Sequence, residues 1–581
     1  MADVAQSGSG TTDLAEARTT FRRSHGSDLA ARGEPFLWGM GGALAFGMTM
    51  IIGFVAMVLY FGLTTFWPKP IEVVTLMDGK VIAGEPLRQE RYRPTADQLA
   101  AENETVRQAI AADLGFATRT LYHLGNYDFY GDDFRWVPDF QAKQTERPAG
   151  LVLVERQEWG AFIGHISAIT VKGSKIEGDA LTPEVLAAAH VEARARRERL
   201  HDIENGRIAD VNHEMEALRL QARRAVLDYG TGTPGQIAAQ AEVDRRTAEL
   251  QAGYTTLAAE AQIIKAEEAA NTVTFREIGG ATKVYPLSAI VRYFESNDLG
   301  LGGSLAVYGA RWWEYLTAEP REANTEGGVA PAIFGTVVMT LVMSLLVAPF
   351  GVITALYLRE YAKQGRIVSI VRISVNNLAG VPSIVYGVFG LGFFAYILGG
   401  SIDALFFPER LPSPTFGTGG LLWSALTLAL LTVPVVIVAT EEALSAVPRS
   451  MREGSLACGA SKWQTIRYIV LPRAAPGIMT GLILAMARGA GEVAPLMLVG
   501  VVKLAPQLPF DLNWPFAHLE RSFMHLGFHI FDVGFQSRNT EAGRPMVFVT
   551  TLVLIVIVLL LNVSAIAIRN RLKRRFQGSQ F

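Results

Sequence analysis

An arginine and a glutamate stand alone in an otherwise uncharged stretch of the sequence. Between residues 477 and 502 the ionisable side chains are Arg488 and Glu492, and a spacing of four residues places both on one face of a helix, well inside its span. Ionisable groups at membrane depth are costly and normally face a bundle interior or a water-filled path. The guanidinium is a planar fork of donors that suits the oxygens of an oxyanion. The pair therefore indicates either contact with an anion in transit or an ion pair that only joins helices.

A second informative pattern is the loop between residues 448 and 472. Pro448 can start a short helix, and Gly459 can end it in the left-handed conformation. Ser461 and Gln464 have the spacing of a capping box for a second helix, which Pro472 is expected to end. The side chains expected on one face of that helix are Trp463, Ile466 and Val470. The loop is therefore predicted to be a compact helix-turn-helix, a shape suited to receive a push from a separate motor protein.

This loop resembles the "EAA" coupling motif of permeases of binding-protein-dependent ABC importers. The family pattern favours two alanines where this chain has other small residues. The residues that the resemblance assigns to ATPase coupling are Glu453, Gly454, Ser455, Gly459, Ile469, Leu471 and Pro472. Segments 376–387, 440–444 and 487–495 further resemble the PstA permeases of phosphate importers, and the whole resemblance covers about residues 330–570.

The resemblance implies inward transport of inorganic phosphate. The implied partners are a homologous PstC-like permease, a dimer of a PstB-like ATPase, an external PstS-like phosphate-binding protein and membrane lipid. The chain itself is expected in the bacterial inner membrane as a multi-pass protein. Hydrogenphosphate carries a P–OH donor that sulfate lacks, and Glu492 could accept from it. The candidate substrate-pathway residues are Arg488, Glu492, Asn376, Asn377 and Ser383. The alternatives are the PstC-like partner permease, a permease for another oxyanion and, in another class, a membrane signalling receptor.

Several missing features limit the function. The sequence has no G-x-x-x-x-G-K-[ST] phosphate-binding loop, so we expect a permease subunit that is not an enzyme, with ATP hydrolysis in a separate subunit. Cys458 is the single cysteine, and His165, His213 and His525 show no metal-ligand spacing. We therefore expect no catalytic residue, no metal and no cofactor, and solvated histidines. A net charge of −2 gives no reason to expect a nucleic-acid partner.

Half of the residues are hydrophobic and 19% are charged, a balance that predicts a membrane part and an aqueous part. A spanning helix needs about 20 apolar residues. Six stretches meet this requirement: 35–68, 327–358, 373–402, 411–440, 477–502 and 545–568. The first is too long for a signal peptide and is expected to remain as a helix. The predicted fold is an all-α polytopic membrane protein with six transmembrane helices, the type I core of ABC importer permeases, and a large α+β extracytoplasmic insert.

The expected domains follow from these stretches. They are a cytoplasmic tail (1–35), the first transmembrane helix (36–66), the extracytoplasmic domain (67–328), the permease core (329–568) with the coupling loop (441–475), and a basic cytoplasmic tail (569–581). Eighteen Lys and Arg flank the helices on one side and five on the other, which predicts that both termini are cytoplasmic. A receptor would need a larger cytoplasmic domain than the first tail.

The insert is predicted to contain a helical hairpin over residues 183–270. Apolar residues at a 3-4 spacing, among them Val243, Leu250 and Leu257, predict the seam between its arms. β-type segments at 151–163 and 273–285 frame the hairpin. It could serve as a spacer, as a docking arm for a partner, or as a ligand sensor.

Small and polar residues recur along the third and second apolar stretches. Asn376, Gly380, Ser383, Gly387 and Gly390 are expected on one face of a single third helix. This stripe indicates either close helix packing through small residues or a pathway lining. On the second helix, Thr336, Thr340 and Ser344 are expected to pack against neighbouring helices.

Overall fold

The computed structural model describes residues 35–100, 103–321, 324–511, 514–537 and 540–577 of the 581-residue chain. Contacts divide the chain into two units, residues 1–63 and 64–581. In the described residues, six helical segments are long and apolar enough to cross a membrane: Trp38–Thr64, Ala330–Tyr361, Ser383–Phe406, Leu421–Ser445, Lys462–Gly491 and Thr540–Arg571. The expected polytopic architecture is therefore confirmed.

The described part of the first unit belongs to α3 (Pro35–Thr64), an uncharged helix of 30 residues. The arginines expected in the cytoplasmic tail before it (Arg18, Arg22, Arg23 and Arg32) lie outside the described residues, as do residues 578–581 of the C-terminal tail.

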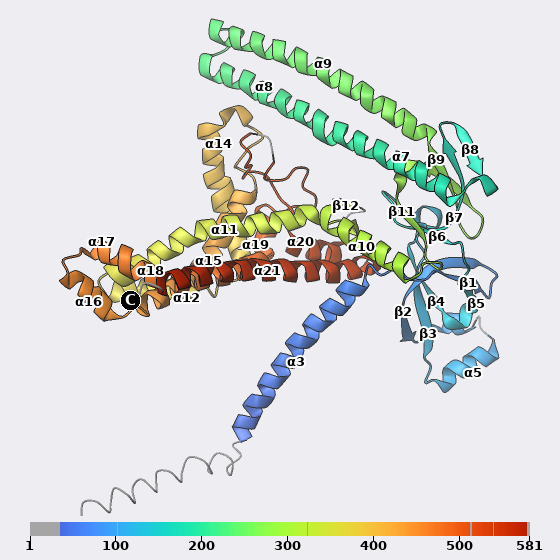
Figure 1. The fold of residues 1–581 in the computed structure, drawn as a ribbon, viewed down its shortest axis with the longest axis horizontal. Coiled ribbons are helices and arrows are strands. Elements are labelled where there is room, and N and C mark those ends of the chain that lie inside the picture. The colour runs from blue at the N-terminus through green and yellow to red at the C-terminus, as the bar shows by residue number, and fades with distance from the viewer. Residues whose placement is uncertain (1–34, 101–102, 322–323, 512–513, 538–539, 578–581) are drawn as a thin grey trace, which may run out of the picture. The chain divides into compact units, whose positions relative to one another are not determined.

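Four helices form the centre of the second unit (Figure 1): α11 (Ala330–Leu356), α15 (Leu421–Ser445), α18 (Leu471–Gly491) and α21 (Thr540–Gln577). α15 packs against both α11 and α18, and the shared core includes Met339, Leu428 and Ala485. A Cβ atom added at Gly477 or Gly481 would lie 2.5 Å from the Cβ of Ala443 or Ala439. Small residues therefore allow α18 and α15 to approach closely.

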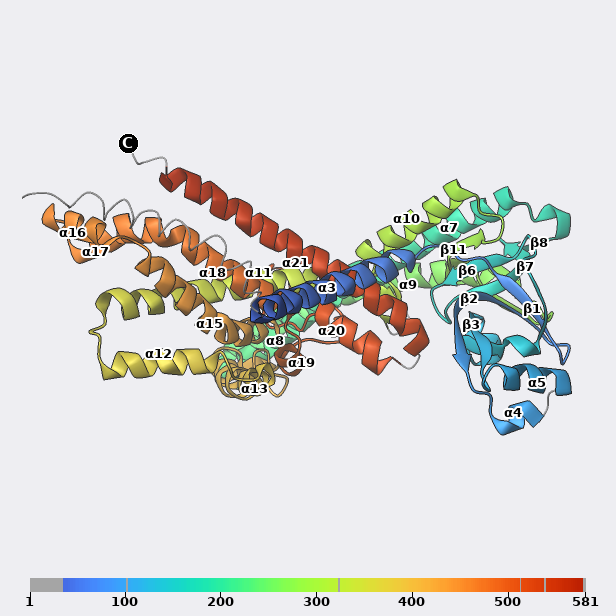
Figure 2. The ribbon, with the colours of Figure 1, turned by 90° about the horizontal axis from the view of Figure 1, so that it is seen from below.

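The third apolar stretch is not one helix, so this prediction is wrong. It contains α12 (Arg366–Leu378), α13 (Ser383–Phe389), the π-helical η7 (Gly390–Gly399) and α14 (Gly400–Phe406). Figure 2 shows α12 in profile and α13 nearly end-on, so the chain turns sharply between them. Pro382 lacks an N–H group and disfavours helical geometry at the preceding residue, which explains the break. Asn376 and Ser383 therefore do not share one helix face.

The boundaries of the next two helices also differ from the expectation. α15 begins at Leu421 and not near residue 411, because residues 411–420 contain two prolines and three glycines. α18 ends at Gly491, and the backbone of Glu492 is extended. Short helices α19 (Ala494–Val499) and α20 (Leu526–Phe531), with π-helical η10 (Asp532–Gln536), follow before α21.

Two of the threonines expected between helices are fully buried in α11. Thr336 and Thr340 each donate a hydrogen bond to the carbonyl oxygen four residues earlier, at 2.7 Å. The hydroxyl oxygen of Thr336 also accepts from the backbone N–H of Leu526 at 2.9 Å. These contacts join α11 to the start of α20, in agreement with the predicted packing role.

In its described residues the insert contains two antiparallel sheets of five or more strands. The first has the order β4-β3-β2-β1-β5 and consists of β1 (Glu72–Leu76), β2 (Val81–Tyr92), β3 (Ala117–His123), β4 (Phe134–Pro138) and β5 (Ala142–Glu146), with short helices α4 (Ala96–Ala100), α5 (Glu104–Ala112) and α6 (Tyr127–Tyr130). The second has the order β10-β9-β7-β6-β11, with β8 beside β7, and consists of β6 (Val152–Arg156), β7 (Phe162–Val171), β8 (Ser174–Glu177), β9 (Thr272–Arg276), β10 (Thr282–Pro286) and β11 (Ile290–Glu295). Ile71 and Ala83 pack with Leu153 and Ile163 and so join the two sheets.

The predicted hairpin is present, and its arms lie side by side in Figure 1. It consists of α7 (Pro183–His201), π-helical η3 (Asp202–Arg207), α8 (Ile208–Tyr229) and α9 (Pro234–Ala270). The hydroxyl oxygens of Thr182 and Thr233 accept from the backbone N–H groups of Val185 and Gln236 and cap the two arms. The hairpin is not independent of the sheet, because Leu186 of α7 packs in the same core as Phe162 and Phe275.

A last helix of the insert, α10 (Leu301–Thr317), is followed by β12 (Pro320–Arg321) and β13 (Glu326–Gly327) and leads into α11. Tyr315 of α10 packs with Ala332 at the start of α11, whereas Leu356 at the end of α11 packs with Leu444 and Val447 beside the coupling loop. The segment Ala330–Tyr361 has 32 residues and is about 48 Å long at 1.5 Å per residue. The insert and the coupling loop therefore lie at opposite ends of this helix.

Two deletions test how the hairpin depends on its base. Replacing residues 213–254 with a short Gly/Ser linker keeps α7 on the sheet and the cluster of Ile203 with Leu257, so we expect membrane expression near that of the wild type. Deleting residues 184–269 also removes Leu186, whose burial contributes about 1.5–3 kcal/mol, and should lower expression and thermal stability. Equal loss in both variants would show that the distal arms are needed for folding.

Candidate functional site

The coupling loop forms the expected helix-turn-helix. Its first helix, α16 (Arg449–Ala457), has Cys458 as its C-cap residue and is followed by Gly459, which has φ +85°. The N–H groups of Gly459 and Ala460 donate to the carbonyl oxygens of Leu456 and Ser455, the hydrogen-bond pattern of a Schellman motif. The predicted capping box is present at the start of α17 (Lys462–Thr465), between Ser461 and Gln464.

Polar contacts hold the loop against the end of the bundle. Arg452 donates to the carbonyl oxygens of Val447 and Leu444 at 2.6 and 2.7 Å and pairs with Glu360 at 3.0 Å. The hydroxyls of Ser455 and Thr465 lie 2.9 Å apart and join α16 to α17. The loop is therefore fixed to the C-terminal ends of α11 and α15.

The expectation that Pro472 ends the second helix is wrong. α17 continues through π-helical η9 (Ile466–Val470) directly into α18, with Pro472 in its first turn. The wider π turn changes the hydrogen-bond register just before the proline ring, which explains why the helix continues. Of the three residues expected on one face, Ile466 and Val470 are buried, whereas Trp463 is 51% exposed.

The residues assigned to coupling divide into a surface set and a supporting set. Glu453, Gly454 and Gly459 are exposed. Ser455, Ile469, Leu471 and Pro472 are half-buried. Leu456, Trp463 and Tyr468 are exposed apolar side chains on the same loop. The sequence analysis did not predict this exposed apolar surface, although it did single out Trp463 as one residue of an apolar helix face.

Arg488 and Glu492 form an ion pair, with Nε and Oε1 3.5 Å apart. The expectation that both lie well inside a helix is wrong, because α18 ends at Gly491 and Glu492 is its C-cap residue. A cation in the last turn interacts favourably with the negative end of the helix dipole. The Arg488 side chain is 39% exposed, so donors of its guanidinium are open to a further oxygen ligand.

The other predicted pathway residues lie in different surroundings. Asn376 lines a cavity of about 290 Å³ with Arg372, Val375 and Glu441. Arg372 Nε lies 3.3 Å from Glu441 Oε1. Asn377 is exposed on α12, and Ser383 is half-buried at the start of α13. Sequence reasoning singled out neither Arg372 nor Glu441 as a site residue, although Glu441 belongs to segment 440–444.

The glycines of the third stretch serve close packing. A Cβ atom added at Gly387 would lie 2.7 Å from Cα of Pro495, and one at Gly390 would lie 2.1 Å from Oγ1 of Thr427. This part of the stripe therefore joins α13 and η7 to α19 and α15.

The expectation that His525 is solvated is wrong. Its side chain is fully buried, and its Nδ1 accepts from the backbone N–H of Gly527 at 3.1 Å, which caps α20. Burial lowers the pKa of His525 to about 4. In the described residues no group of three or more His, Cys, Asp or Glu could hold a metal ion.

Comparisons with known proteins identify the family to which this membrane bundle and its loop belong. Residues 347–578 match the family of binding-protein-dependent transport system inner membrane components. The phosphate transport system permease protein PstA 1 of Mycobacterium tuberculosis is 36% identical over 275 residues, covering 47% of this chain and 81% of that protein. A probable ABC transporter permease, YqgH of Bacillus subtilis, is 34% identical and covers 37% of this chain and 67% of its own length.

The chain belongs to this family and is a PstA-like permease of an ABC importer. It is therefore a multi-pass inner-membrane protein of a transport family and not an enzyme. Membership implies an ATPase and a substrate-binding protein as partners. An inward-facing structure of the MetNI methionine ABC transporter shares 19% identity, covering 42% of this chain and 94% of that chain, with a TM-score of 0.31.

The buried histidine predicts a pH dependence of stability. Below pH 6.5, the ordinary pKa of histidine, the unfolded chain binds a proton at His525 that the folded chain binds only near pH 4. The contribution of the neutral His525 to the free energy of unfolding is therefore complete above pH 6.5 and decreases as the pH falls toward 4. His525→Asn retains a capping acceptor but does not titrate. We expect the loss of melting temperature in detergent between pH 7 and pH 5 to be smaller in this variant than in the wild type. An unchanged loss would contradict the assigned role.

Proposed function

We propose that this chain is the permease subunit of an ATP-driven importer of inorganic phosphate and forms the anion path together with a second, PstC-like permease. The observation that carries the proposal is Arg488, a partly exposed arginine with free donors at the end of a spanning helix. Phosphate oxygens suit its planar donor fork. The name of the relative PstA 1 supports phosphate over other oxyanions.

The proposed orientation places both termini and the coupling loop (441–475) in the cytoplasm and the insert (67–328) outside. The excess of Lys and Arg on the loop side supports this assignment, and so does the length of α11, since the insert and the loop lie at its two ends. The proposed domains keep the expected bounds, with the hairpin at 183–270, the core at 329–568 and the basic tail at 569–581.

A dimer of PstB-like ATPases is proposed to bind the loop through Glu453 and the neighbouring apolar side chains. Leu456, Trp463 and Tyr468 are exposed beside a charged residue, a composition typical of protein interfaces. The contacts of Arg452 with Glu360 and with the end of α15 would transmit a displacement of the loop to the helices.

The cavity beside Asn376 is proposed to belong to the cytoplasmic part of the path. It contains the positive charge of Arg372, which Glu441 balances. Asn377 and Ser383 would line the same route at the turn between α12 and α13. A PstS-like binding protein would deliver phosphate from outside, and the hairpin would serve as its spacer or docking arm.

A pair of glycine variants tests the coupling role. A Cβ atom has open space at both Gly454 and Gly459, but only Gly459 has a positive φ. Gly459→Ala therefore strains the turn, by about 1–2 kcal/mol, whereas Gly454→Ala does not and approaches the family pattern. We expect phosphate-dependent ATPase activity of the assembled complex to fall several-fold in Gly459→Ala and to remain normal in the control. Equal activities would argue against coupling through this turn.

Substitutions of the ion pair test the substrate role. Loss of one charged hydrogen bond, about 1.5–3 kcal/mol, corresponds to a ten- to hundredfold change, so Arg488→Gln should reduce phosphate uptake by about that factor while the complex still assembles. Arg488→Lys keeps the charge but not the fork and should be less impaired.

The double variant Arg488→Gln/Glu492→Gln separates the substrate role from a structural one. If the pair only joins helices, neutralising both residues should restore uptake, because neither charge is left unpaired. Near-normal uptake in the double variant would therefore contradict contact with phosphate. Uptake of sulfate in place of phosphate by the wild type would favour the alternative of a permease for another oxyanion.

A further inference from the structure

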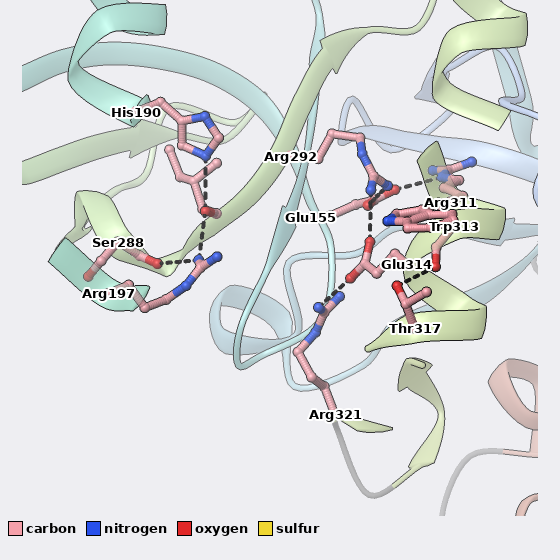
Figure 3. Close-up of polar contacts among 11 residues, drawn as sticks. Glu155, His190, Arg197, Ser288, Arg292, Arg311, Trp313, Glu314, Thr317 and Arg321 are labelled. Atoms are coloured by element: carbon pink, nitrogen blue, oxygen red, sulfur yellow. Dashed lines mark hydrogen bonds and ion pairs between the residues drawn. The ribbon is translucent and has the colours of Figure 1, made fainter. Parts of the chain in front are cut away.

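The helix α10, which joins the insert to α11, has three different faces. One face carries the aromatic residues Tyr308, Trp312 and Tyr315, which pack with Phe66, Val549 and Ala332. A second face carries Arg311 and Glu314, which point into the insert (Figure 3). The third face is exposed and carries no charge: every exposed residue of α10 is Leu, Gly, Ala, Trp or Thr. Its large side chains are Leu301, Leu305, Trp313 and Leu316.

The charged face of α10 is held firmly against the second sheet. Arg311 Nε lies 2.7 Å from Glu155 Oε1, and Arg292 bridges Glu155 and Glu314 at 2.6 and 2.8 Å. Arg321 also pairs with Glu314. Burial alone would raise the pKa of Glu314, but Arg321 and Arg292 hold it below its usual value. Because both the aromatic face and the charged face of α10 are held by these contacts, the helix cannot easily rotate its uncharged face inward.

The depth of α10 follows from its contacts with two spanning helices. The hydroxyl of Tyr315 lies 2.6 Å from that of Thr550, which is the sixth residue of the uncharged stretch 545–568 within α21. On the other side, Tyr315 packs with Ala332, within the first turn of α11. Trp313 is only two residues from Tyr315. The C-terminal end of the exposed face, with Trp313 and Leu316, therefore lies level with apolar turns of helices that cross the membrane.

The residues that follow α3 also contact α10. The spanning helix α3 ends at Thr64. Phe66, two residues later, packs edge-to-face on Trp312 and at a tilt on Tyr315, with ring centroids 5.2 Å apart in both pairs. Trp67 packs on Tyr308 at 5.7 Å. Tryptophan and tyrosine are enriched where a protein crosses from hydrocarbon to headgroups. The aromatic cluster of α10 is thus joined directly to the end of a membrane span.

We propose that the uncharged face of α10 is buried in the lipid of the outer leaflet, so that the insert is bound to the membrane surface by its own interfacial helix. The occupant is lipid because α10 packs on apolar turns of two spanning helices and its exposed face lacks any charge for a polar partner. Leu305 and Trp313, which are 59% and 71% exposed in the chain alone, lie in the acyl and headgroup boundary.

Spin labels at matched positions test this placement in the full complex, reconstituted in phosphatidylglycerol/phosphatidylethanolamine nanodiscs. Cys458 is the single cysteine, so Cys458→Ser gives a cysteine-free background. Leu305→Cys and Trp313→Cys place the label on the uncharged face of α10. Val191→Cys on α7, where the side chain is 67% exposed, is the control in the same domain. Collision rates are measured with oxygen, which concentrates in lipid, and with a water-soluble nickel chelate.

The proposal requires high oxygen and low nickel collision rates at residues 305 and 313 and the reverse at 191. Nickel accessibility at 305 and 313 equal to that at 191 would show that the face lies in water and would overturn the proposal. Low rates with both reagents would show that protein covers the face, either a second permease or another segment of this chain, and would overturn it as well. As a cysteine-independent measurement, Leu305→Asp should reduce membrane-inserted protein several-fold, whereas Val191→Asp should not, and equal yields would also contradict lipid contact.

Discussion

The structure depends on one constraint: a charged group beside apolar helices must have a partner, because an isolated charge in a medium of low polarity is costly. In the described core, Arg452 pairs with Glu360, Arg372 with Glu441 and Arg488 with Glu492. Each pair lies at the end of at least one helix. Asp403, which is fully buried, accepts from the backbone N–H groups of Phe416 and Gly417. The middle of the bundle therefore remains apolar, and polar contacts concentrate where helices end.

This arrangement makes α11 the connection between two polar regions. At its start, the aromatic residues of α10 join it to the insert, and the charged face of α10 binds the second sheet. At its end, Glu360 in η6 (Tyr357–Tyr361) holds the coupling loop through Arg452. One continuous helix thus contacts both the insert and the loop, and a displacement of the loop acts on a helix whose other end is bound to the insert.

Much of the local structure could be predicted because its causes are close in sequence. The Ser461 capping box, the positive φ of Gly459 and the Thr182 and Thr233 caps depend on residues within one turn. The first sheet was missed because its strands are rich in polar residues, such as Arg88, Gln89 and Glu90 in β2. Such strands lack the alternating apolar pattern by which strands are recognised. The break at Pro382 and the late start of α15 do not follow from the absence of charge, because an uncharged apolar stretch can be helical or irregular.

The sequence by itself determined the number of apolar stretches, the coupling motif and the hairpin, since these depend on composition and on short-range spacing. Tertiary structure alone decided which side chains are buried and which charges meet. His525 is buried because α20 packs under Thr336, 190 residues away in sequence, and Arg311 meets Glu155 across 156 residues. No short-range pattern in the sequence can reveal contacts between residues that lie so far apart in the chain. Burial and pairing are properties of surfaces that come together only when the chain has folded, and for that reason the surroundings of Arg488 and the uncharged face of α10 could be read only from the structure.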